Sequence, residues 1–309
     1  MALMLGGTGR ARSALWMAVI WIVVSPKEAL LAEKAWAVPS GELRTAGLRV
    51  RTLGQGTPII LLLHGLAGSN RYFGAEFDGL SQLGQLVAPD LLGFGDSPRP
   101  SDVDYGPDAH ARAVVEALDK LGIEGPIYIV AHSAGSIVAL RIAALEPERI
   151  RGIVAFAPPF YRSEEDALAR IQGLGGMVRL FAMDTFWAKA ACKAMYPFPA
   201  VAARLASRIR PDLPAPIAED AVKHSWASYS GTVRNLILAA QPPPDLRTLG
   251  SPLWIIAGAE DEILDLNHLK ELAESEHVKL EVWPGGHDLP LSDAARSVEL
   301  IETLVRSGK

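Results

Sequence analysis

Continuous apolar runs that recur between helical segments constrain the fold of this chain more than any other sequence feature. The runs at 59–63, 127–131 and 253–258 are almost entirely apolar. A run without polar alternation is typical of a strand that is covered on both faces. Strands that alternate with helices predict a mostly parallel sheet flanked by helices on both faces. We also predict strands at 48–53, 85–90, 150–157 and 278–283, and helices at 107–121, 137–145 and 293–305.

The alternation is interrupted between about 160 and 240, where helical periodicity dominates and no run resembles a strand. A chain of 309 residues can form one large α/β domain with such an insertion. We therefore expect four segments along the chain. They are an N-terminal segment at 1–38, a first core segment at 39–158, a helical cap at 159–245 and a second core segment at 246–309.

The N-terminal segment contains an apolar run at 14–24, preceded by Arg10 and Arg12. The run is shorter than the roughly 20 residues of a membrane-spanning helix, and it is typical of a signal peptide or a short anchor. We expect the protein to be exported or membrane-anchored, with membrane association through 14–24. The alternatives are a misassigned start and a docking helix on a cytoplasmic protein.

Charge and cysteine content exclude several classes of partner and cofactor. The net charge is −5 and the isoelectric point is near 5.8, so nucleic-acid binding lacks an electrostatic basis. Cys192 is the only cysteine, which rules out an intramolecular disulfide, and no Cys/His cluster has the spacing of a zinc site. We expect no metal and no organic cofactor. The oligomeric state is not predicted.

The sequence Ala131-His132-Ser133-Ala134-Gly135 lies between a predicted strand and a predicted helix. A serine in this context can be held on a sharp turn that brings strand and helix backbones close together, so the flanking positions need small residues such as Ala131 and Gly135. The competing interpretation is a helix that begins at a capping serine.

A serine hydroxyl needs a base within hydrogen-bond distance and a carboxylate that orients this base. Asp261 and His287 each follow a predicted strand, and the chain order Ser, Asp, His is that expected for this motif. All three would lie at the carboxyl ends of parallel strands, where ligands bind. The backbone N–H groups of Leu66 and Ala134 would form an oxyanion hole.

In these motifs the chain resembles the α/β-hydrolase superfamily, from about residue 48 to the C-terminus. The resemblance implies a serine hydrolase with a helical cap between strands six and seven. It also implies supporting roles for His64, Gly65, His132 and Gly135, and a structural role for the loop at 90–97. Ala131 stands where the motif has glycine, which keeps a small residue there. Serine at position 133 disfavours the dehalogenase and epoxide hydrolase branches, which have an aspartate in its place.

Other residues could compete for these roles. The acidic neighbours of Asp261 are Glu260, Glu262 and Asp265. Four further histidines, which we interpret as surface or helix residues, are His110, His224, His268 and His277.

The cap carries soft and aromatic side chains suited to an apolar ligand wall. The substrate-binding candidates are Phe181, Phe186, Trp187 and Trp226. The same side chains could instead form the hydrophobic core of the cap itself.

We therefore expect a hydrolase of carboxylic esters or thioesters with a small apolar substrate. Alternatives on the same fold are a C–C bond hydrolase and a cofactor-free haloperoxidase-like enzyme. His287 is followed by Asp288, whereas the C–C hydrolases usually have tryptophan there. A different class would be a non-catalytic relative that binds a hydrophobic ligand or a partner.

Overall fold

The computed structural model describes residues 37–173, 189–190, 199–209 and 213–308. Its centre is a sheet of eight strands in the order β1-β2-β4-β3-β5-β6-β7-β8. The strands from β3 to β8 are parallel, whereas β2 runs antiparallel to both of its neighbours. The strands are β1 (Glu42–Ala46), β2 (Leu48–Leu53), β3 (Ile59–Leu63), β4 (Gln85–Pro89), β5 (Ile127–His132), β6 (Ile150–Phe156), β7 (Leu253–Gly258) and β8 (Val278–Trp283).

Strand β3 shows why the apolar runs form the centre of the sheet. All five of its residues are buried. Because successive side chains of a strand point to opposite faces, Ile59, Leu61 and Leu63 pack in one hydrophobic cluster and Ile60 and Leu62 in another. The expected parallel sheet with two covered faces is thus confirmed.

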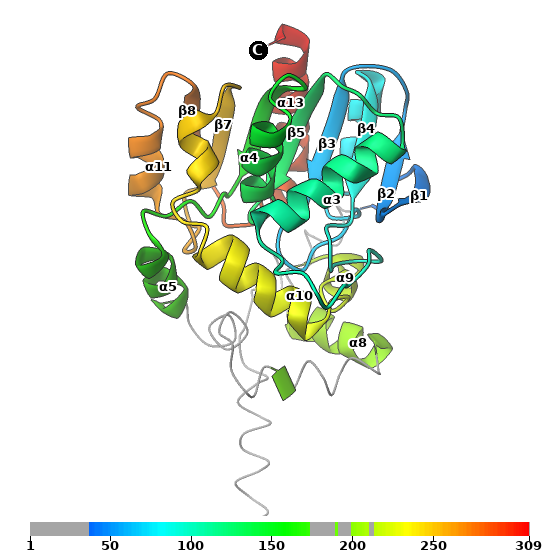
Figure 1. Cartoon of the computed structure of the whole chain (residues 1–309), viewed down its shortest axis with the longest axis vertical. Coiled ribbons are helices and arrows are strands. Elements are labelled where there is room, and N and C mark those ends of the chain that lie inside the picture. Colours follow the sequence, from blue (N-terminus) through cyan, green and yellow to red (C-terminus); the bar gives the residue numbers. More distant parts are fainter. Residues whose placement is uncertain (1–36, 174–188, 191–198, 210–212, 309) are drawn as a thin grey trace, which may run out of the picture.

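Helices cover both faces of the sheet (Figure 1). Helices α3 (Pro107–Lys120) and α4 (Gly135–Leu145) pack against one face together with α11 (Leu266–Leu272). The 3-10 helix η1 (Ala75–Gln82) and α13 (Ala294–Ser307) pack against the other face. A short helix, α12 (Leu289–Ser292), precedes α13.

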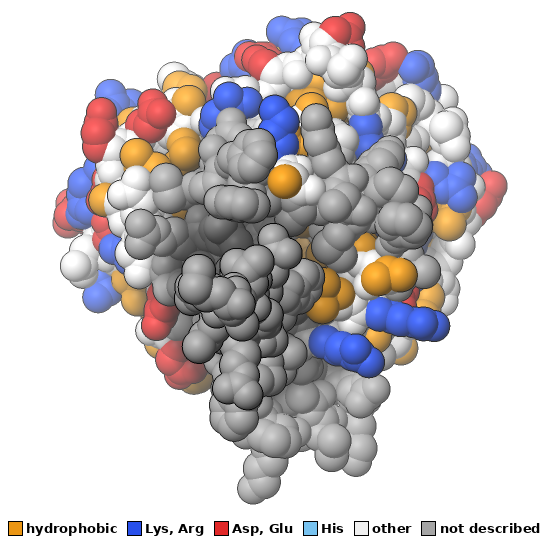
Figure 2. Space-filling view, turned by 90° about the horizontal axis from the view of Figure 1, so that it is seen from below, with side chains coloured by type: hydrophobic (Ala, Val, Ile, Leu, Met, Phe, Trp, Pro, Cys, Tyr) orange, Lys and Arg blue, Asp and Glu red, His pale blue; other side chains and the backbone are white. Residues whose placement is uncertain are grey.

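An insertion of helices separates β6 from β7, as the sequence predicts. Figure 1 shows α8, α9 and α10 gathered at one end of the sheet, and Figure 2 views the molecule from this end. Polar contacts from this insertion reach the loops that follow β3 and β4, so it lies at the carboxyl ends of the parallel strands. Its described elements are α5 (Glu164–Gly173), α8 (Pro199–Ile209), α9 (Ala215–Asp220), α10 (Trp226–Gly231), the π-helix η2 (Thr232–Leu238) and the 3-10 helix η3 (Pro244–Thr248).

Some elements differ from the sequence prediction. Strand β1 was not predicted, because only Ala46 among its residues is buried and it lacks an apolar pattern. It joins β2 through Gly47, whose φ of +85° favours glycine. Helix α4 begins at Gly135, two residues before the predicted start. The boundaries predicted for the four segments remain predictions.

The apolar run at 14–24 lies outside the described residues. Among the residues that the structure does describe, no helix has the length and apolarity needed to cross a membrane.

Candidate active site

Ser133 occupies a strained turn between β5 and α4. Its φ is +50°, a left-handed conformation that costs a non-glycine residue about 1–2 kcal/mol. The Ser133 N–H donates to the carbonyl of Phe156 at 2.8 Å, and the Ser136 N–H donates to the Ser133 carbonyl at 2.9 Å. A Cβ at Gly135 would lie 2.6 Å from the carbonyl oxygen of His64, so only glycine fits there. The turn thus holds the serine outside the regular geometry of strand and helix.

The structure brings His287 and Asp261 together with Ser133. The Nε2 atom of His287 lies 3.0 Å from Ser133 Oγ, and its Nδ1 lies 2.8 Å from Asp261 Oδ2. Because a carboxylate only accepts hydrogen bonds, Nδ1 carries the proton and Nε2 presents its lone pair to the serine hydroxyl. The Asp261 side chain is only 1% exposed, and its other oxygen accepts a hydrogen bond from the Ile263 N–H at 2.9 Å. The carboxylate is therefore fixed on both sides.

The oxyanion hole expected from the N–H groups of Leu66 and Ala134 remains a prediction, which two observations support. A Cβ at Gly65 would lie 3.0 Å from the Cβ of Ser133, so the backbone before Leu66 packs directly on the turn. Within the described part of the chain, the N–H groups of Leu66 and Ala134 have no acceptor. Two such N–H groups beside a nucleophile can stabilise a developing oxyanion.

His64 supports the loop that carries Leu66. Its Nε2 accepts a hydrogen bond from the Leu91 N–H at 2.9 Å, and its Nδ1 lies 2.7 Å from the Gly65 carbonyl. These partners require a neutral ring with the proton on Nδ1. Burial lowers the pKa of His64 to about 4, so the ring remains neutral at physiological pH.

His132 supports the backbone of His287. Its Nε2 donates to the His287 carbonyl oxygen at 3.0 Å, and its ring stacks on Tyr72 with centroids 4.6 Å apart. Burial, followed by the nearby His287, lowers the pKa of His132 to about 4. The Tyr72 hydroxyl in turn donates to Asp288 at 2.9 Å. Sequence reasoning did not single out Tyr72, and it noted Asp288 only because it follows His287.

The loop at 90–97 is organised around the buried carboxylate of Asp90. Its Oδ1 accepts hydrogen bonds from the backbone and side-chain amides of Asn70, at 2.5 and 2.8 Å, and its Oδ2 accepts one from the Asp96 N–H at 2.7 Å. Burial raises the pKa of Asp90 above its ordinary value although these hydrogen bonds favour the charged form. At Gly95, a Cβ would lie 2.3 Å from this carboxyl group.

The four other histidines are placed differently from one another. His110 lies on α3 as predicted, but its ring is buried beside Phe94 with Nε2 3.2 Å from the Thr232 hydroxyl, so it is no surface residue. His224 stacks on Tyr229 and belongs to no helix. His268 lies on α11, and His277 is exposed.

The substrate-binding candidates Phe181, Phe186 and Trp187 lie outside the described residues. Trp226 is half-buried at the start of α10, and its ring centroid lies 6.2 Å from that of Tyr229. Its contact with substrate remains a prediction. Within the described ranges, no three His, Cys, Asp or Glu side chains converge as metal ligands would.

A mostly parallel sheet that presents a Ser-His-Asp arrangement at its carboxyl ends defines the class of α/β hydrolases. The chain belongs to the alpha/beta hydrolase fold family, whose family model matches residues 58–294. It is 30% identical over 277 residues to 2-hydroxymuconate semialdehyde hydrolase from Pseudomonas putida, covering 85% of this chain and 93% of that protein.

Solved structures share the same fold at low sequence identity. An epoxide hydrolase from Vigna radiata matches with a TM-score of 0.66 at 21% identity, covering 86% of this chain and 98% of that chain. The enol-lactonase from Burkholderia xenovorans LB400 matches with a TM-score of 0.65 at 18% identity, covering 84% and 97%. A shared fold does not by itself define the reaction.

Proposed function

We propose that this chain is a serine hydrolase that cleaves a carboxylic ester or thioester of a small apolar substrate through an acyl-enzyme. The observation that carries the proposal is the continuous hydrogen-bonded row from Asp261 through His287 to Ser133, with distances of 2.8 and 3.0 Å. Such a row supplies a nucleophile, its base and the group that orients the base.

The reaction has two steps in which the same groups act. His287 Nε2 takes the proton of Ser133 Oγ as this oxygen attacks the substrate carbonyl carbon, and the N–H groups of Leu66 and Ala134 stabilise the oxyanion. The tetrahedral intermediate collapses, the alcohol or thiol leaves with the proton from His287, and an acyl-serine remains. Water then attacks this ester in the same way and releases the acid.

A second candidate reaction is C–C bond hydrolysis, which the similarity to the Pseudomonas putida semialdehyde hydrolase favours. A triad with an oxyanion hole can also serve a reaction in which the leaving group is a carbon atom. The residue after His287 is Asp288, whose carboxylate accepts from Tyr72. We propose ester hydrolysis ahead of C–C hydrolysis, because the site contains a nucleophile, a base and N–H donors for the oxyanion, which are the groups that acyl transfer needs.

Labelling with a fluorophosphonate probe tests the nucleophile. We expect the wild-type protein to be labelled at Ser133, Ser133→Ala to be unlabelled, and Ser136→Ala to be labelled like the wild type. Ser136 is a matched control, because it is a buried serine one turn along the chain whose hydroxyl has no partner among the described residues. A folded wild-type protein that resists the probe would favour a ligand-binding protein without catalysis.

A substrate comparison then separates the two reactions. Rates are measured on p-nitrophenyl esters of increasing acyl length and on a 2-hydroxy-6-oxodienoate, the substrate type of C–C hydrolysis. Turnover of esters alone supports the proposal. Faster turnover of the dienoate would assign the chain to C–C hydrolysis.

A further inference from the structure

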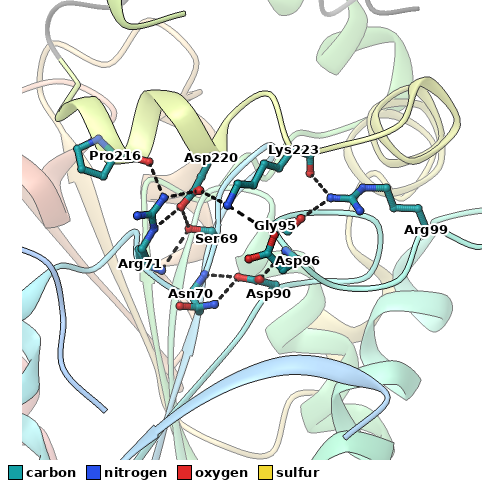
Figure 3. A network of polar contacts seen from close by, with 10 residues as sticks. All are labelled: Ser69, Asn70, Arg71, Asp90, Gly95, Asp96, Arg99, Pro216, Asp220 and Lys223. Atoms are coloured by element: carbon teal, nitrogen blue, oxygen red, sulfur yellow. Dashed lines mark hydrogen bonds and ion pairs between the residues drawn. The ribbon is translucent and has the colours of Figure 1, made fainter. Parts of the chain in front are cut away.

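A carboxylate of the insertion, that of Asp220, contacts the loop at 64–72, which also contains Leu66 (Figure 3). Asp220, the last residue of α9, accepts a hydrogen bond from Ser69 Oγ at 2.5 Å. The guanidinium of Arg71 donates to both of its oxygens, at 2.7 and 2.5 Å. The Asp220 side chain is only 2% exposed, whereas that of Arg71 is half-buried.

Ser69 and Arg71 are joined to Leu66 by a short series of tight turns. The Gly68 N–H donates to the Gly65 carbonyl at 3.2 Å, and the Tyr72 N–H donates to the Ser69 carbonyl at 3.0 Å. Gly68 also packs on the His64 ring, where a Cβ would lie 2.8 Å from Nδ1. Ser69 and Leu66 thus lie three residues apart in a loop that is held by backbone hydrogen bonds.

The loop at 64–72 is held from the core side by different residues. Asp90 binds Asn70, and His132 stacks on Tyr72. The insertion contacts the loop through α9: Asp220 binds the residues on either side of Asn70, and the Pro216 carbonyl accepts a hydrogen bond from Arg71 at 3.2 Å. The position of the loop thus depends on where α9 lies.

We propose that Asp220 is a positioning residue for the oxyanion hole, which sets the place of the Leu66 N–H through Ser69 and Arg71. This inference rests on the proposed serine hydrolase function. It makes the placement of the insertion a condition for stabilising the transition state, in addition to any contact between the insertion and the substrate.

The neighbouring contacts support a defined position for Asp220. Lys223 Nζ lies 3.0 Å from the Asp220 carboxylate and 3.5 Å from that of Asp96, in the loop after β4. Arg99 of the same loop donates to the Lys223 carbonyl at 3.0 Å. The segment 220–223 therefore joins two loops at the carboxyl ends of neighbouring strands, as Figure 3 shows.

The test compares Asp220→Asn with Asp245→Asn. Both changes replace a carboxylate that binds an arginine by an amide of the same shape, but Asp245 pairs with Arg141 of α4 at 3.1 Å. Ser69→Ala is a second variant, for the case that Asp220→Asn does not fold. It removes the hydrogen bond to Asp220 and the one that Ser69 Oγ accepts from the Arg71 N–H, and it keeps the ion pair between Arg71 and Asp220. For each protein, amide hydrogen exchange is measured on peptides covering 62–74, together with the rate constant of fluorophosphonate labelling and the affinity for an aryl boronic acid.

We expect Asp220→Asn and Ser69→Ala to exchange faster in the 62–74 peptides. Labelling slows and boronate affinity falls about tenfold in Asp220→Asn, which is part of the 10²–10³-fold cost of losing a whole donor. KM for an ester changes less than kcat, and Asp245→Asn behaves like the wild type.

The proposal is overturned if Asp220→Asn matches Asp245→Asn in exchange, or if faster exchange leaves labelling and boronate affinity unchanged. A wild-type protein that is never labelled at Ser133 contradicts the serine hydrolase function instead. Exchange alone then decides whether Asp220 holds the loop.

Discussion

The side chain of His132 donates a hydrogen bond to the backbone carbonyl of His287, with 3.0 Å between Nε2 and the oxygen. The residue before Ser133 thus supports the histidine that lies beside the Ser133 hydroxyl. The two imidazole centroids are 4.9 Å apart, in an edge arrangement. The turn at 132–133 and His287 are thus linked by this second contact besides the hydrogen bond from Ser133 Oγ to His287 Nε2.

His132→Phe should lower kcat five- to tenfold with little change in KM. The variant keeps a ring against Tyr72 but loses a hydrogen bond, which is worth about 1 kcal/mol. Because burial lowers the pKa of His132 to about 4, the donor is neutral throughout the working range, and the ratio of wild-type to variant kcat should stay constant from pH 5.5 to 8. Tyr72→Phe serves as a comparison, since it keeps the stacked ring and the hydrogen bond from His132 to His287 but removes the hydroxyl that donates to Asp288. Unchanged kcat in His132→Phe would refute a supporting role.

Asp261→Asn should reduce kcat about 10³- to 10⁴-fold, because the amide no longer fixes the imidazole tautomer that leaves Nε2 free to accept the serine proton. Glu260→Gln is the matched control, since Glu260 is the adjacent exposed carboxylate. Steady-state ester hydrolysis checks both variants. If Glu260→Gln were the slower of the two, the acid of the triad would be assigned wrongly.

Gly135→Ala should disrupt the turn that holds Ser133. The added Cβ would lie 2.6 and 2.8 Å from the carbonyl oxygens of His64 and Leu63, so the helix must move. We expect a loss of about 1–3 kcal/mol in the free energy of unfolding and slower labelling of Ser133. Urea unfolding and probe kinetics measure the two effects. Gly79→Ala, where a Cβ meets nothing within 4 Å, should leave both unchanged.

The stability of the fold should decrease as the pH falls from about 6.5 towards 4. Burial lowers the pKa of His110 to about 4, while an unfolded histidine titrates near 6.5, so the unfolded chain binds more protons between these values. His110→Phe should flatten this dependence by about 1–3 kcal/mol between pH 7 and pH 4.5. His277→Gln, at an exposed position, should not. The free energy of unfolding is measured by urea titration at several pH values. An equal dependence of this free energy on pH in the two variants would contradict the prediction.

The sheet could be predicted from the sequence because its strands are buried on both faces. In β3 and β7 every residue is buried, and uninterrupted apolar runs report this directly. Strand β1 could not be found this way, since four of its five residues are exposed and it pairs only with β2.

The proximity of Ser133, Asp261 and His287 could be predicted because each follows a strand in a recognisable local motif. The contacts around them could not. Tyr72 reaches Asp288 across 216 positions of the chain, and Ser69 reaches Asp220 across 151, so no local pattern marks either pair. The sequence predicts that His110 lies on a helix, but its burial depends on Phe94 and Thr232, which come from other parts of the chain.

The distant partners of the loop at 64–72 also have a consequence for synthesis of the chain. The loop leaves the ribosome early, yet Asp220 and Asp288 are translated 151 and 216 residues after Ser69 and Tyr72. Strands β3, β4 and β5 can pair before then, because domains begin to fold as they emerge. The nascent chain therefore contains Ser133 before the residues that surround it in the folded protein have been synthesised. We expect hydrolytic activity only after the last part of the sheet has been added.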